Sequence, residues 1–112
     1  MRKFKTGSTR DDDSDKLDYS GFFSPLVRKR RAEYMHKHRL QSDGKLRASD
    51  NWKLGLPIEE SYKSLERHFT DLALIMDGYP QEAREDIENA LCAIMFNAES
   101  ILLEKLKENE KR

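Results

Sequence analysis

The clearest folding signal in this chain lies between Pro57 and Pro80, in the stretch PIEESYKSLERHFTDLALIMDGYP. Its apolar residues recur at alternating spacings of four and three, which is typical of an amphipathic helix. They are Ile58, Tyr62, Leu65, Phe69, Leu72 and Met76. Pro57 suits the helix start, whereas Gly78 and Pro80 stop it. We therefore expect this stripe to face a helical core.

A further long helix is predicted from near Gln81 to about Lys107. Its apolar stripe consists of Ile87, Leu91, Ile94, Ala98, Ile101, Leu102 and Leu106. Because only a tight turn separates it from the preceding helix, the two long helices should pack antiparallel. The predicted fold class is all-α.

The segments before Pro57 are more polar. Ser24-Pro25 is a helix start, because Ser is a good N-cap and Pro suits the first helical position. A basic helix is expected from Pro25 to about Arg39, followed by a loop from Gln41 to Gly55. Residues 1–20 form an N-terminal arm, interpreted either as a disordered tail or as an arm that orders over a partner or ligand. Residues 21–112 are predicted to form a single helical domain.

Composition excludes several classes of protein. The chain has 112 residues, of which 38% are charged, and no stretch approaches the ~20 apolar residues of a membrane span. The N-terminus does not look like a secretory signal. Its 21 basic and 21 acidic residues balance, which makes nucleic acid an unlikely partner. The single Cys92 precludes an intrachain disulfide and favours a cytoplasmic location. Because a small chain buries a limited core, we expect a homodimer or homotetramer.

Polar residues flank both core stripes. Ser64, His68 and Asp71 form one line on the first long helix. Asp86, Asn89 and Asn97 form a similar line on the second, with Glu85 and Glu88 close by. Carboxylates and an imidazole gathered in this way suit a hard divalent cation such as Mg²⁺. The alternative is that these residues are the ordinary polar flanks of two amphipathic helices.

Basic and aromatic residues suggest a phosphate-bearing ligand. Arg28, Lys29 and Arg31 make the first helix locally positive and can hold phosphates, or they form a solvated face. Trp52 can stack on a base, or it anchors the loop as an apolar plug. The sequence has no glycine-rich phosphate loop and no zinc-type spacing. Any nucleotide site must therefore depend on a metal ion and basic side chains.

These features, taken in order, resemble the phage and bacterial dATP/dGTP diphosphohydrolase family, small relatives of the MazG-type nucleotide pyrophosphohydrolases. The resemblance covers roughly residues 6 to 105. The matching segments are Thr6–Asp11, Lys16–Tyr19, Phe23–Leu26, Ala32–Met35, Ser49–Trp52, Ser64–His68 and Glu88–Asn97. Their order and spacing carry the resemblance, since no single motif is decisive.

The resemblance implies a fold and an activity. It implies a small MazG-like helical domain that hydrolyses purine deoxynucleoside triphosphates to the monophosphate and pyrophosphate, with Mg²⁺ or Mn²⁺. It also implies a helical dimer or tetramer, and an N-terminal arm that contributes to structure or ligand contacts. MazG-type enzymes carry E-x-x-E and E-x-x-D helices, whereas this chain has His68-x-x-Asp71 and Asp86-x-x-Asn89. Fewer carboxylates line one face here, so the number of bound metals stays open.

The predicted site follows from the polar lines and the resemblance together. The catalytic residues are His68, Asp71 and Asp86, and the metal ligands are Asp71, Asp86, Glu88 and Asn89. The substrate-binding residues are Arg28, Lys29, Arg31, Asp50, Asn51, Trp52, Arg67 and Asn97. The rival interpretation is a non-catalytic helical phage protein that binds nucleotide, nucleic acid or a protein partner.

Overall fold

The computed structural model describes residues 2–3, 9–10 and 15–110, and it is helical as predicted. Its elements are β1 (Arg2–Lys3), β2 (Thr9–Arg10), α1 (Tyr19–Phe22), α2 (Pro25–Lys37), the 3₁₀ turn η1 (Asn51–Leu54), α3 (Ile58–Met76), the 3₁₀ turn η2 (Pro80–Glu82) and α4 (Ile87–Glu110). The strands β1 and β2 pair antiparallel. The rest of the predicted arm before Asp15 lies outside the described residues.

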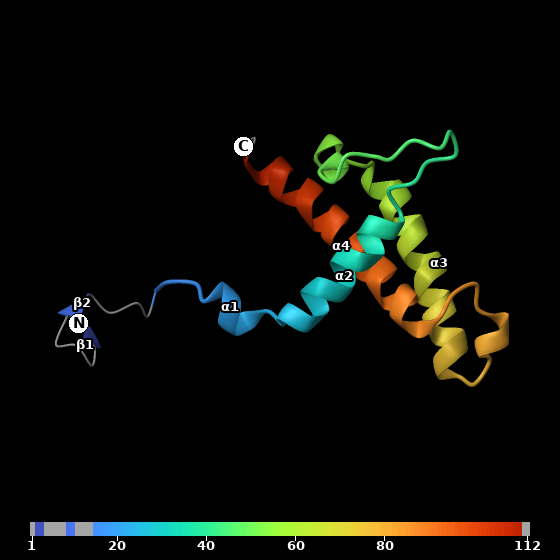
Figure 1. The fold of residues 1–112 in the computed structure, drawn as a ribbon, viewed down its shortest axis with the longest axis horizontal. Helices are drawn as coiled ribbons and strands as arrows, with labels where there is room; N and C mark the ends of the chain where they lie inside the picture. Colours follow the sequence, from blue (N-terminus) through green and yellow to red (C-terminus); the bar gives the residue numbers. More distant parts are fainter. Residues whose placement is uncertain (1, 4–8, 11–14, 111–112) are drawn as a thin grey trace.

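The helices α3 and α4 form the body of the molecule, with α2 lying across α4 (Figure 1). Acidic Glu59 and Glu60 occupy the first turn of α3, where the helix dipole favours them. Past the end of α3, Gly78 adopts a φ of 92°. A positive φ of this kind suits glycine because other residues carry a Cβ.

The second long helix begins at Ile87, six residues later than predicted. Asp86 caps it, because its Oδ1 accepts a hydrogen bond from the backbone N–H of Asn89 at 2.9 Å. The residues before Asp86 are held elsewhere: Ala83 is extended, and the backbone N–H of Arg84 donates to Asp71 Oδ1 at 3.1 Å. The intervening segment therefore forms η2 and a short bent connection instead of the first turns of a helix.

Half of the predicted core stripe of α3 is exposed and the other half, Ile58, Leu65 and Leu72, is only partly buried, so the stripe does not face a core as predicted. Tyr62, Phe69 and Met76 are 56%, 58% and 69% exposed. The buried residues of α3 are instead Ser61 and Asp71, which lie roughly a quarter turn around the helix from the stripe. On α4 the buried residues are also small or polar: Ala90, Cys92, Ala93 and Asn97.

Polar pairing accounts for the observed orientation of α3. Ser61 donates through Oγ to Ser100 Oγ on α4 at 3.2 Å, and Asp71 pairs with Arg84. A buried carboxylate without a partner would be costly, so its pairing constrains how α3 is turned. The α3 face that carries the polar line therefore lies inward, and much of the apolar stripe is left exposed.

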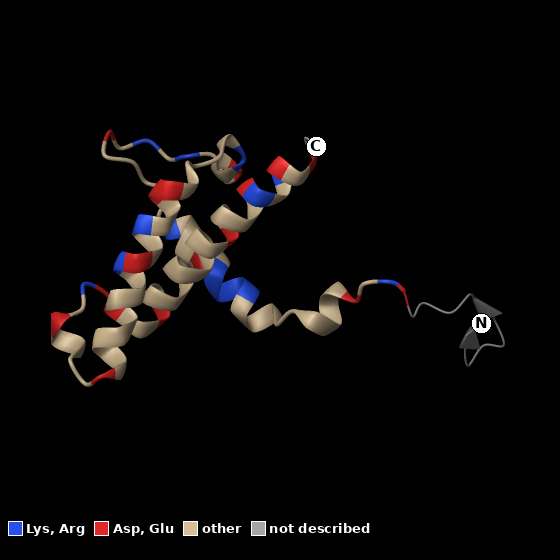
Figure 2. Ribbon diagram, turned by 180° about the vertical axis from the view of Figure 1, so that it is seen from behind, with Lys and Arg blue, Asp and Glu red and all other residues tan. Residues whose placement is uncertain are grey.

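Ion pairs attach α2 to α4. Arg30 contacts Glu88 through Nε at 2.7 Å and Asn89 Oδ1 through Nη2 at 3.2 Å, and Arg31 pairs with Glu99. The basic residues of α2 are visible as a blue band beside α4 (Figure 2). The helix starts as expected, with the backbone N–H of Val27 donating to Ser24 Oγ, and ends at Lys37. The prediction extended it to Arg39.

The remaining segments border this body. Residues 39–47 fold back on themselves through a bridge between Leu40 and Leu46, and η1 leads into α3. The short α1 extends away from α2, α3 and α4 (Figure 1). Among the described residues, no helix combines the length and apolar character needed to cross a bilayer.

Candidate functional site

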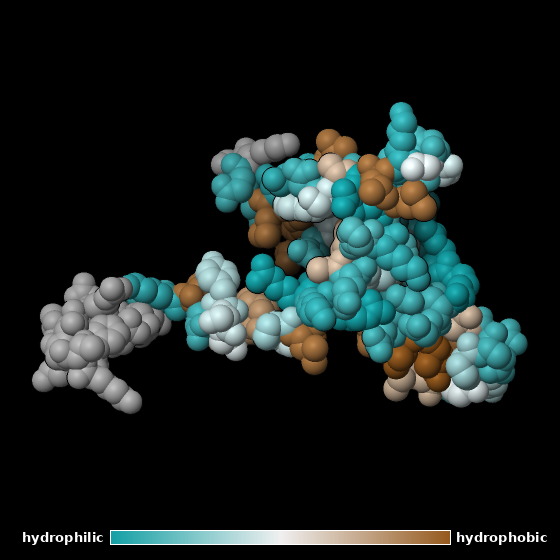
Figure 3. Space-filling model, in the orientation of Figure 1, coloured by the Kyte–Doolittle hydropathy of each residue, from teal (hydrophilic) through white to brown (hydrophobic). Residues whose placement is uncertain are grey.

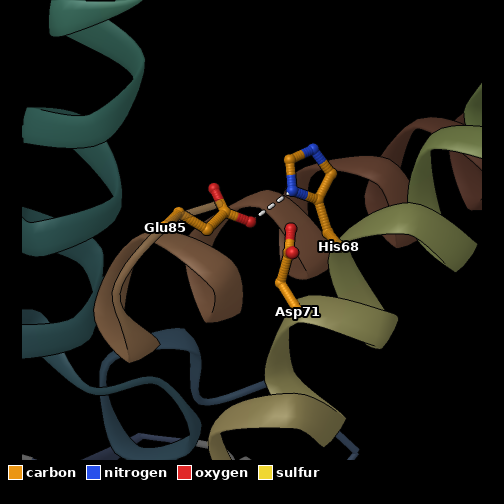
Figure 4. A group of neighbouring side chains, drawn as sticks. All are labelled: His68, Asp71 and Glu85. Atoms are coloured by element: carbon orange, nitrogen blue, oxygen red, sulfur yellow. Dashed lines mark hydrogen bonds and ion pairs between the residues drawn. The ribbon is translucent and has the colours of Figure 1, made fainter. Parts of the chain in front are cut away.

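Three titratable side chains converge where the end of α3 meets the connection to α4. His68 and Asp71 lie one turn apart on α3, and Glu85 approaches from the residue before the α4 cap (Figure 4). One ligand atom from each lies within 4.8 Å of the others. His68 Nδ1 lies 2.5 Å from Glu85 Oε1, and both side chains are mostly buried. We call these three residues the His68 cluster.

Arg84 completes the surroundings of Asp71. Its Nε and Nη2 donate to Asp71 Oδ2 at 2.9 and 2.7 Å, and its backbone N–H donates to Oδ1. Asp71 is only 3% exposed, so it needs this partner. The hydrogen bonds from Arg84 lower the pKa of Asp71, which is therefore ionised at neutral pH. The same pairing raises the pKa of Arg84.

The local sequence explains how the cluster forms. A spacing of three on a helix puts His68 and Asp71 on one side of α3. Asp86 is the N-cap of α4, so Glu85 lies just outside the helix in the bent connection. From that position its carboxylate meets the imidazole of His68 (Figure 4).

The donors of the His68 cluster fit a divalent cation. Two carboxylates and one imidazole are ligands that Mn²⁺ and related ions accept, and carboxylate oxygens suit Mg²⁺. Each carboxylate oxygen has two lone pairs, so Asp71 can accept from Arg84 and still offer a ligand site. The ligand atoms lie within 4.8 Å of one another, so side-chain adjustments would bring them into reach of one ion with ~2.1 Å bonds.

A cleft of about 920 Å³ opens beside the cluster, and His68 belongs to both. Its walls come from the end of α2, the 39–56 segment, the first half of α3 and the middle of α4. Its polar and basic lining includes His36, His38, Arg39, Arg47, Asn51, Ser64, Arg67 and Asn97, and its aromatic lining is Tyr34, Trp52 and Phe96. Tyr34 is partly buried, and this burial raises its pKa.

The cleft brings together part of the predicted substrate-binding set. Asn51, Trp52, Arg67 and Asn97 line it. Asn97 is buried, and its Nδ2 donates to the carbonyl of Ala93 at 2.8 Å. The other four predicted residues do not line this cleft. Arg28 and Lys29 are exposed on α2, Arg31 pairs with Glu99, and Asp50 pairs with Lys53 at 3.6 Å.

Of the predicted metal ligands, the structure places only Asp71 in the His68 cluster. Asp86 caps α4, and Glu88 and Asn89 hold Arg30 of α2. Glu85, which the sequence placed only nearby, takes part instead. One signal in the sequence indicates this: Asp is among the preferred N-cap residues, and Asp86 directly precedes the apolar stripe of the helix. With Asp86 assigned as the cap, Glu85 falls outside the helix.

The fold and the site together define a small all-α protein with a candidate cation cluster beside an open cleft. No protein-family model, curated protein or solved structure matches the chain.

Proposed function

We propose that this protein is a divalent-cation-dependent nucleoside triphosphate pyrophosphohydrolase. It would bind a purine deoxynucleoside triphosphate in the cleft and release the monophosphate and pyrophosphate. The observation that carries the proposal is that His68 belongs both to the cluster and to the cleft wall. A ligand in the cleft would therefore present its phosphates to the cluster.

The lining of the cleft supports a nucleotide as the ligand. Trp52 is half exposed, so its indole offers a face on which a base can stack. Arg67 lies one residue from His68 and can neutralise phosphate oxygens next to the cluster. An aromatic surface for a base and a basic side chain for phosphates match the chemistry of a nucleoside triphosphate.

In the proposed reaction, each residue of the His68 cluster and the neighbouring Arg84 would have a separate role. Asp71 and Glu85 would hold the cation, which on binding neutralises phosphate charge. In the tautomer that donates from Nδ1 to Glu85, the imidazole of His68 leaves Nε2 as an acceptor. Nε2 can then take a proton from the attacking water. Arg84 would keep the Asp71 carboxylate ionised and oriented.

The choice of purine, deoxyribose and pyrophosphate release comes from the family resemblance. The test is a product assay on the purified chain with each of the four deoxynucleoside triphosphates and ATP. Each substrate is incubated with Mg²⁺, Mn²⁺ or EDTA, and pyrophosphate and orthophosphate are measured separately. The expected result is metal-dependent pyrophosphate release from dATP or dGTP. Orthophosphate release, or no turnover of any substrate, would refute the proposal.

Matched variants make the test specific to the site. Glu85→Gln should abolish turnover because it removes a cluster carboxylate. Glu88→Gln is the control: it is the same change three residues along, at a carboxylate that contacts Arg30 instead of the cluster. Loss of activity in the second variant but not the first would contradict the assignment of Glu85.

A second candidate function has one observation in its favour. Both oxygens of Asp71 already accept hydrogen bonds from Arg84, so the pair is complete without a cation. On that account the cluster is structural, and the cleft binds nucleotide without turnover. Metal-independent binding of dATP, measured by calorimetry, together with no product in the assay above, identifies this case.

A further inference from the structure

The apolar stripe of α3 forms an exposed surface with a groove in it. Tyr62 and Phe69 are more than half exposed, and with Leu65 they line a depression of about 330 Å³. Met76 continues the same face and is 69% exposed. We call Tyr62, Leu65, Phe69 and Met76 the α3 apolar face. Figure 3 shows hydrophobic surface near the η2 end of the α3–α4 pair.

A second exposed apolar surface lies in the N-terminal part of the chain, before and at the start of α2. Residues 17–27, which we call the α1 segment, carry large apolar side chains that are mostly exposed. They are Leu17, Tyr19, Phe22, Phe23, Leu26 and Val27, with exposures of 69%, 69%, 73%, 66%, 78% and 46%. The segment extends away from the helical body (Figure 1), and hydrophobic surface is visible along it (Figure 3). One chain thus carries both an apolar projection and an apolar groove.

We propose that the α1 segment of each copy docks on the α3 apolar face of a second copy. Two copies related by a two-fold axis would make this contact twice, once in each direction. The aromatic side chains of one segment would enter the groove beside Tyr62 and Phe69 of the other chain. None of these residues belongs to the His68 cluster or lines the cleft, so the inference does not depend on the proposed function.

The areas involved fit a stable dimer. Aromatic side chains bury about 150–250 Å² each when fully covered. At the observed exposures, each side of one contact can cover on the order of 400 Å². Two contacts with two sides each then bury about 1,600 Å², which is the size of an ordinary specific interface.

Charge complementarity supports the same pairing. Arg28 and Lys29 follow the α1 segment directly and are exposed. Glu59 and Glu66 lie beside the α3 apolar face and are exposed as well, and Glu59 also pairs with Lys63 of its own helix at 3.7 Å. Opposite charges at the rim of an apolar contact help to fix its register.

A second copy is the occupant that these surfaces favour. Exposed apolar surface of this extent is a liability in a free chain and needs a partner that is always present. The described residues bury only three apolar side chains, those of Ala90, Cys92 and Ala93. A small chain with so little core gains the missing burial most directly from its own second copy.

The first test is the mass of the full chain in solution, by light scattering after size-exclusion chromatography at micromolar concentration. The wild type should be a dimer. Phe69→Glu on the face and Phe22→Glu on the segment should each lower the dimer fraction at least tenfold. Lys63→Gln, which lowers the net charge by the same one unit but lies on α3 outside the apolar face, should leave the dimer intact. A monomeric wild type, or a dimer that survives Phe22→Glu, would overturn the proposal.

Mixing the two variants tests whether the α1 segment of one copy docks on the α3 apolar face of the other. Combined with each other, the Phe22→Glu and Phe69→Glu chains retain one intact contact, made by the unaltered segment of the Phe69→Glu chain. They should therefore form a heterodimer, whereas each alone should not. If the mixed chains do not form a heterodimer, the proposed docking between copies is refuted.

A crosslinking experiment covers the case in which the charged variants do not fold. Phe22→Cys chains mixed with Phe69→Cys chains and oxidised should give a band of two chains on a denaturing gel. A chain carrying both cysteines should also link to a second chain. An intrachain bond in that double variant means that the segment folds back on its own α3, and it refutes the proposal.

Discussion

Breaking the ion pair between Asp71 and Arg84 should cost a different amount of stability depending on which partner is replaced. Asp71 is almost completely buried, whereas the Arg84 side chain is 55% exposed. Replacing Arg84 by Met strands a buried carboxylate, but replacing Asp71 by Asn releases a guanidinium that water can solvate. We therefore expect Arg84→Met to destabilise the protein more than Asp71→Asn at pH 7.

The magnitudes follow from the burial of each group. Removing one partner of a fully buried ion pair costs ~3–5 kcal/mol. Because Arg84 lies at the edge of the site and its backbone N–H still donates to Asp71, we expect about 2–3 kcal/mol for Arg84→Met. Asp71→Asn keeps the shape and one acceptor oxygen, so its cost should be about 1 kcal/mol. The double variant should also cost about 1 kcal/mol, because no buried charge is left.

The assay is urea unfolding followed by circular dichroism, with the four proteins compared at one chain concentration. In a thermal scan, Arg84→Met should lower Tm by roughly 10–20 °C. The double-mutant cycle should give a coupling free energy of ~2 kcal/mol. Additive effects, or an Asp71→Asn variant less stable than Arg84→Met, would refute the reasoning from burial.

Three further predictions concern pH, metal and ligand. The folded pKa of Asp71 is lowered, so its contribution to stability is present above the unfolded pKa of ~3.9 and is lost as the pH falls through the folded value. In Arg84→Met this dependence should reverse, because burial then raises the pKa of Asp71, so that the variant gains stability as the pH falls from 7 to 4. Unfolding measured from pH 7 down to pH 2 covers both the gain in the variant and the loss in the wild type. Glu85→Gln should weaken Mn²⁺ binding at least tenfold in calorimetry, whereas Glu88→Gln should leave it unchanged. Trp52→Ala should weaken dATP binding by ~1–3 kcal/mol through lost base stacking, with helicity unchanged; equal affinity in the variant would mean that the base lies elsewhere.

The sequence predicted the helices well because their signals are local. Ser24-Pro25, Pro57 and Gly78 act within one or two turns, and the observed elements respect them. The start of α4 was misplaced because two local signals compete there. Residues 81–85 can continue a helical pattern, but Asp86 is a better cap, and Asp71 binds the backbone of Arg84 from a distance in sequence. A single-sequence pattern does not contain that long-range contact.

The candidate site was predicted in part for the same reason. His68 and Asp71 share a helix, so their spacing alone brought them together. Glu85 joins them through the packing of the connection against α3, which periodicity does not report. The cleft combines residues from four segments, and only Asn51, Trp52, Arg67 and Asn97 of the predicted binding set line it. The charge of Arg31 alone predicts a phosphate contact, but in the structure the side chain pairs with Glu99 of α4.

The orientation of α3 links these errors to the proposed dimer. Amphipathic periodicity identifies which side chains leave water, but it does not say whether the surface that covers them belongs to the same chain. Here the two buried polar residues of α3, Ser61 and Asp71, are satisfied within the chain by Ser100 and Arg84. The strongest apolar signal, at Tyr62 and Phe69, is left without that cover. An apolar stripe as regular as this one is normally buried. Because the single chain leaves it exposed, a second copy is the surface that we propose buries it.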